Sequence, residues 1–196
     1  MSIAADRPPT TRTLDGVLVP TPGTFDIDPS HTLVGFSVRH LMVSKVRGRF
    51  GSFSGTVTIA EDPLLSSVEV SIDPSSIATG DEKRDGHLVS PDFLDVEQYP
   101  GITFTSTRVS DHTGKQFKLE GDLTVHGVTR PVVLDATLEG IAATPWGSEA
   151  IGFSATAEVD REDFGLTWNQ SLETGGVLVG KTAKIEIEAE LTRRQD

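Results

Sequence analysis

The 196-residue chain contains no cysteine, which excludes several classes of protein. Disulfide cross-links, cysteine-ligated zinc sites and thiol catalysis all need a residue that is absent. A chain of this length buries about 70% of the surface that it exposes when unfolded, so it needs neither a disulfide nor a structural metal to hold a core. The length is typical of one domain.

Long apolar runs are also absent, and cations are scarce. No segment approaches the roughly 20 apolar residues that cross a bilayer as a helix, so we expect no transmembrane segment. Residues 1–16 contain no apolar stretch typical of a secretory signal, which favours a cytoplasmic location, or an exported one if the chain is a processed form. Because 17 lysines and arginines stand against 29 aspartates and glutamates, the net charge is −12. An acidic chain repels nucleic acid, so we expect no nucleic-acid partner.

Apolar residues alternate with small or polar residues from Thr24 onward. Strict alternation marks strands with one apolar face and is typical of antiparallel sheets. The alternating sets are Val34, Phe36 and Val38; Val68, Val70 and Ile72; Ile102 and Phe104; Phe117, Leu119, Leu123 and Val125; Val132, Leu134, Ala136 and Leu138; Ile151, Phe153, Ala155, Ala157 and Val159; and Ala183, Ile185, Ile187, Ala189 and Leu191.

One predicted strand changes parity within its length. The first half has its apolar or small residues at Val46, Gly48 and Phe50, and the second half has them at the opposite parity, at Phe53, Gly55, Val57 and Ile59. The change falls at Gly51–Ser52, where a β-bulge or a sharp bend would return both halves to one apolar face. Long bent strands of this kind are what a closed barrel requires.

Two segments depart from the strand pattern. Residues 1–23 are rich in proline, threonine and charge and are interpreted as a flexible N-terminal tail, although Leu14, Val17 and Val19 could pack on the domain as a short extra piece. Residues 81–94 form the one helical stretch. About eight strands and one short helix predict an all-β fold, an antiparallel barrel over residues 24–193. Such a barrel is filled by side chains or holds one small ligand, and alternation alone does not distinguish these cases.

A phosphate-loop pattern occurs near the C-terminus, at Gly175, Gly180, Lys181 and Thr182. The chemistry of that motif requires a helix after the loop, so that backbone amides and the helix dipole face the phosphates. The residues after Thr182 alternate with period two, which predicts a strand. We therefore interpret the match as a turn followed by a strand and expect no nucleotide binding.

Candidate catalytic and metal-ligating groups are sparse. The five histidines, none with the helical spacing of a zinc site, are His31, His40, His87, His112 and His126. We therefore expect no metal site. The carboxylates of Asp92, Asp95 and Glu97 could do acid–base chemistry, but such clusters are more often a helix cap and a solvated surface. We predict no catalytic residues.

Positive charge is concentrated in one segment. No acidic residue lies between Asp28 and Glu61, whereas this segment contains Arg39, Lys45, Arg47 and Arg49. The last three have the parity opposite to the apolar residues and should point away from the apolar face. This pattern is typical of a solvated edge. A sharper hypothesis is that Arg39 and Lys45 meet an anionic head group near the turn at residues 40–45.

Four blocks of the sequence carry a resemblance to a known family. They are FDIDPSHTLVGFSVRHLMVSKVRGRFGSFSGTV, DGHLVSPDFLDVEQYPGITFTST, GDLTVHGVTRPV and DREDFGLTWNQSLETGGVLVG. In order and spacing they resemble the YceI-like family of polyisoprenoid-binding proteins, over about residues 23–193. The resemblance implies an extended antiparallel eight-stranded lipocalin-like β-barrel. It also implies a tunnel that holds a long isoprenoid chain, such as a polyprenyl phosphate or the tail of an isoprenoid quinone.

The resemblance and the apolar face together define a candidate site. By resemblance, the tunnel is lined by Phe36, Val38, Phe50, Phe53, Phe104, Phe153 and Trp168. The predicted lipid-binding set also includes Val34, Val46, Val57, Val125 and Phe164, and the predicted head-group residues are Arg39, His40 and Lys45.

The predicted function is non-enzymatic binding of an isoprenoid lipid for carriage, storage or sequestration, with no cofactor besides that lipid. A homodimer is left open. Two alternatives also remain. One is an enzyme of isoprenoid or small-molecule metabolism that uses His40, His126 or the carboxylates of residues 92–97. The other is a stress-linked structural protein with a filled barrel.

Overall fold

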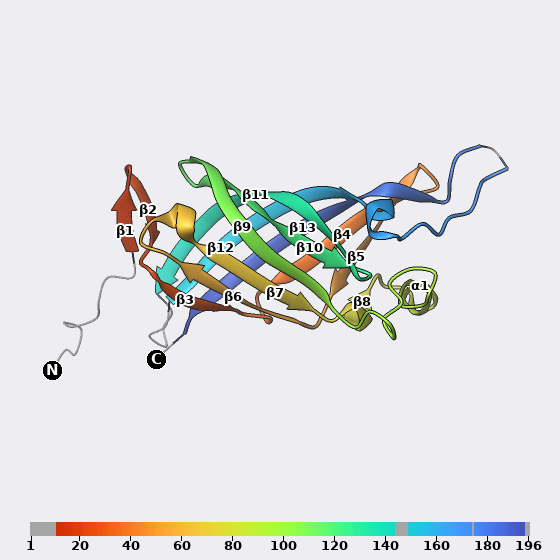
Figure 1. Ribbon diagram of the computed structural model, residues 1–196, viewed down its shortest axis with the longest axis horizontal. Coiled ribbons are helices and arrows are strands. Elements are labelled where there is room, and N and C mark those ends of the chain that lie inside the picture. Colours follow the sequence, from red (N-terminus) through yellow and green to blue (C-terminus); the bar gives the residue numbers. More distant parts are fainter. Residues whose placement is uncertain (1–10, 144–148, 174, 195–196) are drawn as a thin grey trace.

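The structure, a computed structural model, describes residues 11–143, 149–173 and 175–194. Within these ranges the chain is mostly strand, with one α-helix (Figure 1). The strands are β1 Thr11–Leu14, β2 Val17–Pro20, β3 Gly23–Ile27, β4 Leu33–His40, β5 Ser44–Phe50, β6 Phe53–Ile59, β7 Ser67–Ile72, β8 Ile77–Ala78, β9 Ile102–Thr113, β10 Gln116–Val125, β11 Val128–Ala143, β12 Glu149–Asp160 and β13 Val179–Arg193. The helical elements are α1 Glu82–Leu88 and the 3-10 turns η1 Pro63–Leu65, η2 Pro74–Ser76 and η3 Arg161–Phe164.

Strand β13 closes the sheet into a barrel. It pairs with β12 along one edge and with β3 and β4 along the other, always antiparallel. Strands β9 to β13 are continuous, whereas β3–β4, β5–β6 and β7–β8 each form one barrel strand in two parts. The described residues therefore form a closed eight-stranded antiparallel barrel with one helix, and the predicted fold class is confirmed.

The three two-part strands break side by side, at residues 28–32, 51–52 and 73–76. The backbone N–H of Gly51 donates to the carbonyl oxygen of Ser76 at 3.2 Å, and that of Asp73 donates to the carbonyl oxygen of Ser52 at 2.9 Å. The predicted irregularity at Gly51–Ser52 is therefore present as a sharp interruption between two strands. Both residues leave the ladder, so of the two predicted forms the structure has the sharp bend and not the bulge.

Part of the predicted tail is a β-hairpin. Strands β1 and β2 pair through a turn at Asp15 and Gly16, both with positive φ, which is the sequence that a tight hairpin turn favours. Val19 is buried, and Leu14 and Val17 pack against the same apolar cluster. Residues 11–20 therefore form the short extra piece packed on the domain that the sequence left open as an alternative to a flexible tail, while residues 1–10 lie outside the described residues.

The predicted helix over residues 81–94 is shorter than expected. The Asp81 carboxylate caps its N-terminus by accepting from two backbone N–H groups of the first turn, and α1 ends at Leu88. Pro91 disfavours helical geometry in the residue before it, so the chain continues as a series of turns. Those turns bury Phe93 and Leu94 in the core.

The phosphate-loop match leads into a strand. Residues Gly180 to Thr182 belong to β13, and the Lys181 ammonium donates to the Glu162 carboxylate at 2.7 Å. No helix follows the glycines in the described part of the chain, so the geometry that places amides around a phosphate is missing there.

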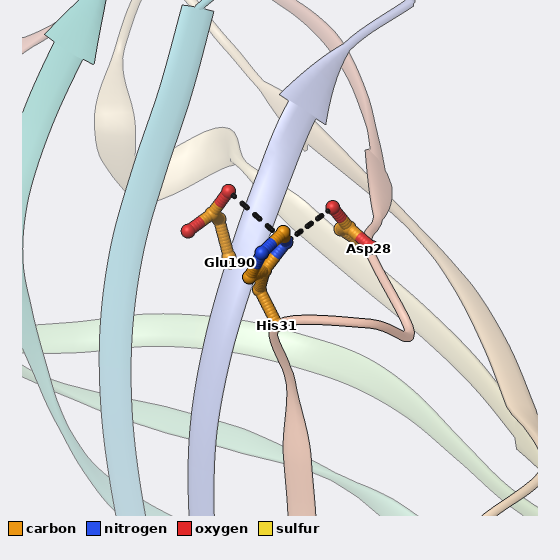
Figure 2. Close-up of side chains that lie close together, drawn as sticks. All are labelled: Asp28, His31 and Glu190. Atoms are coloured by element: carbon orange, nitrogen blue, oxygen red, sulfur yellow. Dashed lines mark hydrogen bonds and ion pairs between the residues drawn. The ribbon is translucent and has the colours of Figure 1, made fainter. Parts of the chain in front are cut away.

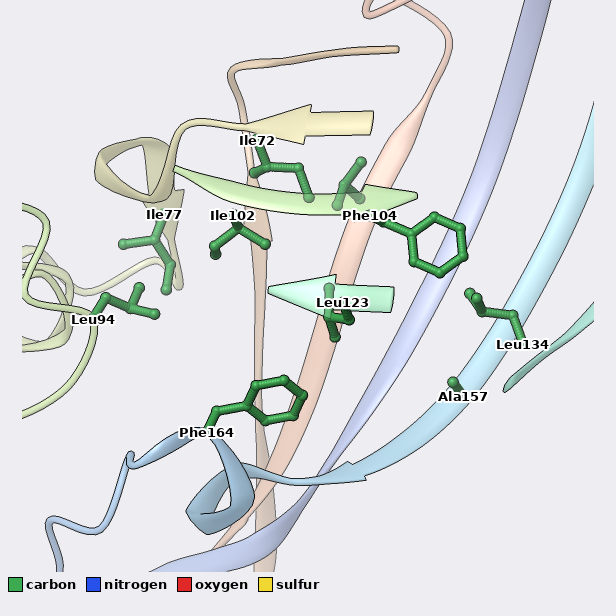
Figure 3. Close-up of a cluster of buried hydrophobic side chains, with 10 residues drawn as sticks. Ile72, Ile77, Leu94, Ile102, Phe104, Leu123, Leu134, Ala157 and Phe164 are labelled. Atoms are coloured by element: carbon green, nitrogen blue, oxygen red, sulfur yellow. The ribbon is translucent and has the colours of Figure 1, made fainter. Parts of the chain in front are cut away.

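Two apolar clusters lie toward opposite ends of the barrel. The cluster at the α1 end, drawn in Figure 3, contains Val34, Ile72, Ile77, Leu94, Ile102, Phe104, Leu123, Leu134, Ala157 and Phe164. The cluster at the β1–β2 end contains Val19, Phe25, Val57, Leu138, Ile151 and Leu191. Many inward side chains beside these clusters are only partly buried, because they line a cavity inside the barrel.

Candidate functional site

The barrel encloses a cavity of about 730 Å³ with a predominantly apolar wall. This volume lies in the range of pockets that bind small molecules. Residues of all eight barrel strands line it, and the wall also includes Val19 of the hairpin and His87 of α1. Because those two elements lie at opposite ends of the long axis in Figure 1, the cavity extends along the barrel.

The barrel is hollow because its inward side chains do not fill it. Phe36, Phe50 and Phe153 point to the interior, line the cavity and are still only partly buried. In a filled barrel, interior side chains pack against one another at crystal-like density and lose this exposure. The alternative of a filled structural barrel therefore does not fit the described residues.

Glycines beneath aromatic rings help to keep the lumen open. A Cβ atom at Gly48 would lie 2.3 Å from Cζ of Phe36, and one at Gly121 would lie 2.4 Å from Cζ of Phe104. Both distances are impossible for real side chains, so each ring lies against bare backbone. The rings thus form part of the wall instead of crossing the cavity.

Most of the predicted lipid-binding residues line the cavity. The wall contains Val34, Phe36, Val38, Val46, Phe50, Val57, Phe104, Val125, Phe153, Phe164 and Trp168. Phe53 is the exception, because it packs against the apolar cluster beside the break between β5 and β6. Contact of these residues with a lipid stays a prediction.

Aromatic side chains cluster at the α1 end of the cavity. The rings of His87 and Trp168 meet edge to face with centroids 4.7 Å apart, and Phe93 lies 5.2 Å from Trp168. His87 Nε2 is also 2.7 Å from a carboxylate oxygen of Asp92. These contacts join α1, the turns after it and the segment after η3, so three chain segments frame this end of the cavity.

Cations outnumber anions on the cavity wall, although the chain is acidic. The lysines and arginines among the lining residues are Arg12, Arg39, Lys83, Arg84, Lys115 and Arg161, and the one acidic lining residue in the described ranges is Asp81. Several of them lie at the α1 end with His40 and His87. The charge of the buried Arg161 is weakly screened, whereas the exposed Arg39 and Lys83 are screened by solvent, and together these cations favour an anionic or electron-rich group at this end.

Arg161 is the most buried of these cations, at 5% exposure. Its Nε donates to the carbonyl oxygen of Gly180 at 2.9 Å, and its Nη1 donates to the carbonyl oxygen of Leu166. Its Nη2 is buried and makes no hydrogen bond within the described residues. Burial lowers the pKa of the Arg161 guanidinium because the apolar surroundings disfavour charge. An oxygen atom of a ligand would satisfy this donor.

Sequence reasoning missed Arg161. It follows β12 directly and lies between Asp160 and Glu162, so its pattern is that of a solvated charge cluster. In the structure the Asp160 carboxylate caps η3, and Glu162 bonds Lys181. Neither carboxylate forms an ion pair with Arg161 within the described residues. Only the fold turns this guanidinium into the barrel.

The predicted head-group residues divide into two groups. Arg39 and His40 line the cavity, whereas Lys45 does not. Lys45 is exposed on β5 and belongs to the outward parity, next to Val46, which lines the cavity. The expected position of Lys45 at the mouth is therefore corrected: its side chain lies outside the wall.

The residues of the enzyme alternative are not joined into one centre. His126 packs on the ring of Tyr99 with centroids 4.5 Å apart, and Asp92 bonds His87. Within the described residues, no hydrogen bond or ion pair links His40 or His126 to the carboxylates of residues 92–97. The groups that acid–base catalysis would combine are thus separately engaged.

A second cluster of polar groups lies outside the barrel wall (Figure 2). His31 Nδ1 is 2.9 Å from Asp28 Oδ2 and 3.8 Å from Glu190 Oε1. Hydrogen bonds from Ser30 and His31 lower the pKa of Asp28 to about 2, and the Asp28 carboxylate raises the pKa of His31. The three side chains could hold a metal ion, although the sequence predicts none. They lie at the break between β3 and β4, where His31 contacts both Asp28 and, on β13, Glu190.

No helix in the described ranges is long and apolar enough to cross a membrane.

A hollow antiparallel barrel with an apolar lumen defines a class, the lipocalin-like ligand-binding barrels. Residues 25–191 match the YceI-like domain, and the chain belongs to this family. A UPF0312 protein of Staphylococcus aureus (strain MSSA476) is 39% identical over 170 residues, which cover 86% of this chain and 96% of that protein.

Solved structures agree with the family assignment. The YceI protein of Campylobacter jejuni is 31% identical, with a TM-score of 0.69 over 80% of this chain and 90% of that one. A polyisoprenoid binding domain from Saccharophagus degradans has a TM-score of 0.66 at 15% identity, over 87% of this chain and 98% of that one. The second match shows the shared fold.

Proposed function

We propose that this protein binds a long isoprenoid lipid, a polyprenyl phosphate or an isoprenoid quinone, along the axis of its barrel. The observation that carries the proposal is the continuous apolar cavity of about 730 Å³ that runs between the two ends of the barrel. The family assignment and the polyisoprenoid binding domain of S. degradans support the same ligand class.

The binding energy would come mainly from burial of the tail. Each methylene group that leaves water contributes about 0.8 kcal/mol, and burial is non-directional, so several tail lengths fit one cavity. Because the wall is predominantly apolar, entry of the tail desolvates few polar groups of the protein.

The head group would lie at the α1 end. Arg39 and His40 line the cavity there, and Arg161 offers a buried N–H donor that has no partner among the residues that the structure describes. A phosphate or a quinone carbonyl supplies the oxygen acceptor that this donor needs. The protein would then carry, store or sequester the lipid, and it would do so without catalysis.

Native mass spectrometry tests the proposal. The protein is purified without detergent, sprayed under native conditions and then extracted with organic solvent. We expect a mass shift that disappears after extraction, and an isoprenoid in the extract. A protein that carries no lipid and takes up neither polyprenyl phosphate nor quinone from added stocks would refute the proposal.

A further inference from the structure

The turn between β4 and β5 exposes three consecutive apolar residues, Leu41, Met42 and Val43. Their exposed fractions are 37%, 56% and 80%. Single exposed apolar residues are common on protein surfaces, but three in a row at the centre of a turn are unfavourable in water. We call these residues the apolar tip.

The backbone of the apolar tip is strained as well. Leu41 has φ of 53° and Met42 has φ of 61°, and the N–H of Val43 donates to the carbonyl oxygen of His40 at 3.1 Å. Turns with two positive φ values favour asparagine and glycine, because larger side chains clash with the backbone. The sequence therefore keeps large apolar side chains where small polar ones would be more stable.

Unpaired cations flank the apolar tip. Arg39 on β4 and Lys45 and Arg47 on β5 are exposed and lie within four residues of the tip, Arg49 lies at the far end of β5, and none of these cations forms an ion pair within the described residues. The nearest strand carries Glu186, whose carboxylate bonds Lys184 at 2.7 Å and also interacts electrostatically with Lys45 and Arg47, so it offsets part of their charge. The neighbouring loop carries the exposed Glu173. The tip thus lies in a locally positive region of a protein whose net charge is −12.

The apolar tip adjoins the α1 end of the cavity. The N–H of Leu41 donates to the carbonyl oxygen of Leu178 at 2.9 Å, and Leu178 lines the cavity together with Arg39 and His40. In Figure 1 the β4–β5 turn projects from the same end of the barrel as α1. A surface that binds this tip would therefore face the cavity mouth.

We propose that the apolar tip and its flanking cations dock this end of the barrel on an anionic membrane surface, so that lipid passes between the bilayer and the cavity. Apolar side chains enter the interface while lysine and arginine heads stay with lipid phosphates, which is the arrangement that interfacial membrane anchors use. The passage of lipid rests on the proposed function, whereas the docking does not.

Vesicle sedimentation tests the docking, with no isoprenoid present. One set of vesicles contains phosphatidylcholine alone, and the other contains phosphatidylcholine with phosphatidylglycerol. We expect binding to the anionic vesicles and little binding to the neutral ones, with a decrease at high salt. Arg47→Gln should weaken binding about fivefold, the factor expected for one cation near such a surface.

The tip variant is Met42→Asn combined with Val43→Ser. Asparagine tolerates positive φ, so this variant should fold, and Val43→Ser alone serves as a second, milder variant. The matched control is Leu64→Ser with Leu65→Ser, an exposed apolar pair in η1 at the opposite end, beside Glu61 and Asp62. The tip variants should lose vesicle binding, and the control should keep it.

The outcomes separate the two proposals. The docking proposal is wrong if the wild-type protein binds vesicles with and without phosphatidylglycerol equally, or binds neither. It is also wrong if the control variant loses as much vesicle binding as the tip variant. Retention of an isoprenoid, measured by native mass spectrometry, should be unchanged in the tip variant, while transfer of that lipid between vesicles should slow. A protein that docks but never holds an isoprenoid would refute the proposed function and leave the docking intact.

Discussion

The sharpest test of a hollow barrel is to place an aromatic ring inside it. Ala155 lies on β12, pairs with Ala136 and Ile187 on the neighbouring strands, and lines the cavity. In Ala155→Phe the added ring would enter open apolar space. The matched control is Thr156→Phe, because Thr156 is exposed on the outward face of the same strand.

The sign of the stability change distinguishes a hollow barrel from a filled one. A phenylalanine in place of alanine removes about 100 Å² more apolar surface from water, which stabilises by at most about 2.5 kcal/mol. The loss of side-chain freedom offsets part of this, so we expect a net gain of about 1 to 2 kcal/mol. In a filled interior the same ring would overpack the core and destabilise it by about 1 to 3 kcal/mol.

Urea unfolding and lipid binding together give the answer. We expect Ala155→Phe to raise the free energy of unfolding relative to Thr156→Phe. We also expect weaker isoprenoid binding, because excluding two methylene groups of the tail already costs about tenfold in affinity. If Ala155→Phe is destabilised, the barrel is filled and not hollow. If the variant binds isoprenoid as tightly as the wild type, the tail does not occupy the lumen.

Four further predictions concern named side chains. Phe36→Asp places a carboxylate on the apolar wall, so it should abolish retention of both polyprenyl phosphate and quinone with some loss of stability, and a folded variant with wild-type affinity would contradict the tunnel assignment. Arg39→Ala should weaken polyprenyl phosphate modestly and leave a quinone of equal tail length unaffected, because Arg39 lines the cavity at the α1 end, and an equal loss for both would exclude a head-group role. Arg161→Lys keeps the charge but cannot make the same set of hydrogen bonds, so the preference for a polyprenyl phosphate over an isoprenoid hydrocarbon should shrink, whereas an unchanged ratio of the two affinities would mean that Arg161 only supports the backbone. The pKa of His31 is raised in the folded protein, so its stabilising contribution is complete below its unfolded pKa and is lost as pH rises through the folded value, whereas that of Asp28 is lost only as pH falls toward about 2. His31→Gln should therefore lower the urea midpoint more at mildly acidic pH than at mildly alkaline pH, and equal losses at the two pH values would contradict this linkage.

The sequence by itself determined the strands and most of the cavity wall. Alternation is a local property, and it identified the inward face of β12 and β13 correctly because side chains of a strand point to opposite faces in turn. The same rule shows why Lys45 points outward while Val46 lines the cavity. The strand after Thr182 was also predictable, and it removed the nucleotide-binding interpretation.

The tertiary structure alone decided what lies inside the barrel. Whether an eight-stranded barrel is hollow or filled by side chains depends on how the sheet closes, here through the pairing of β13 with β3, β4 and β12. No local sequence pattern encodes this long-range register. The same closure brings Asp28 and His31 beside Glu190 across the break between β3 and β4. Closure also places Arg161, which has charged neighbours in the sequence, on the wall of an apolar cavity. Periodicity is a property of neighbouring residues, whereas a cavity is a property of strands that meet only after the whole sheet has closed.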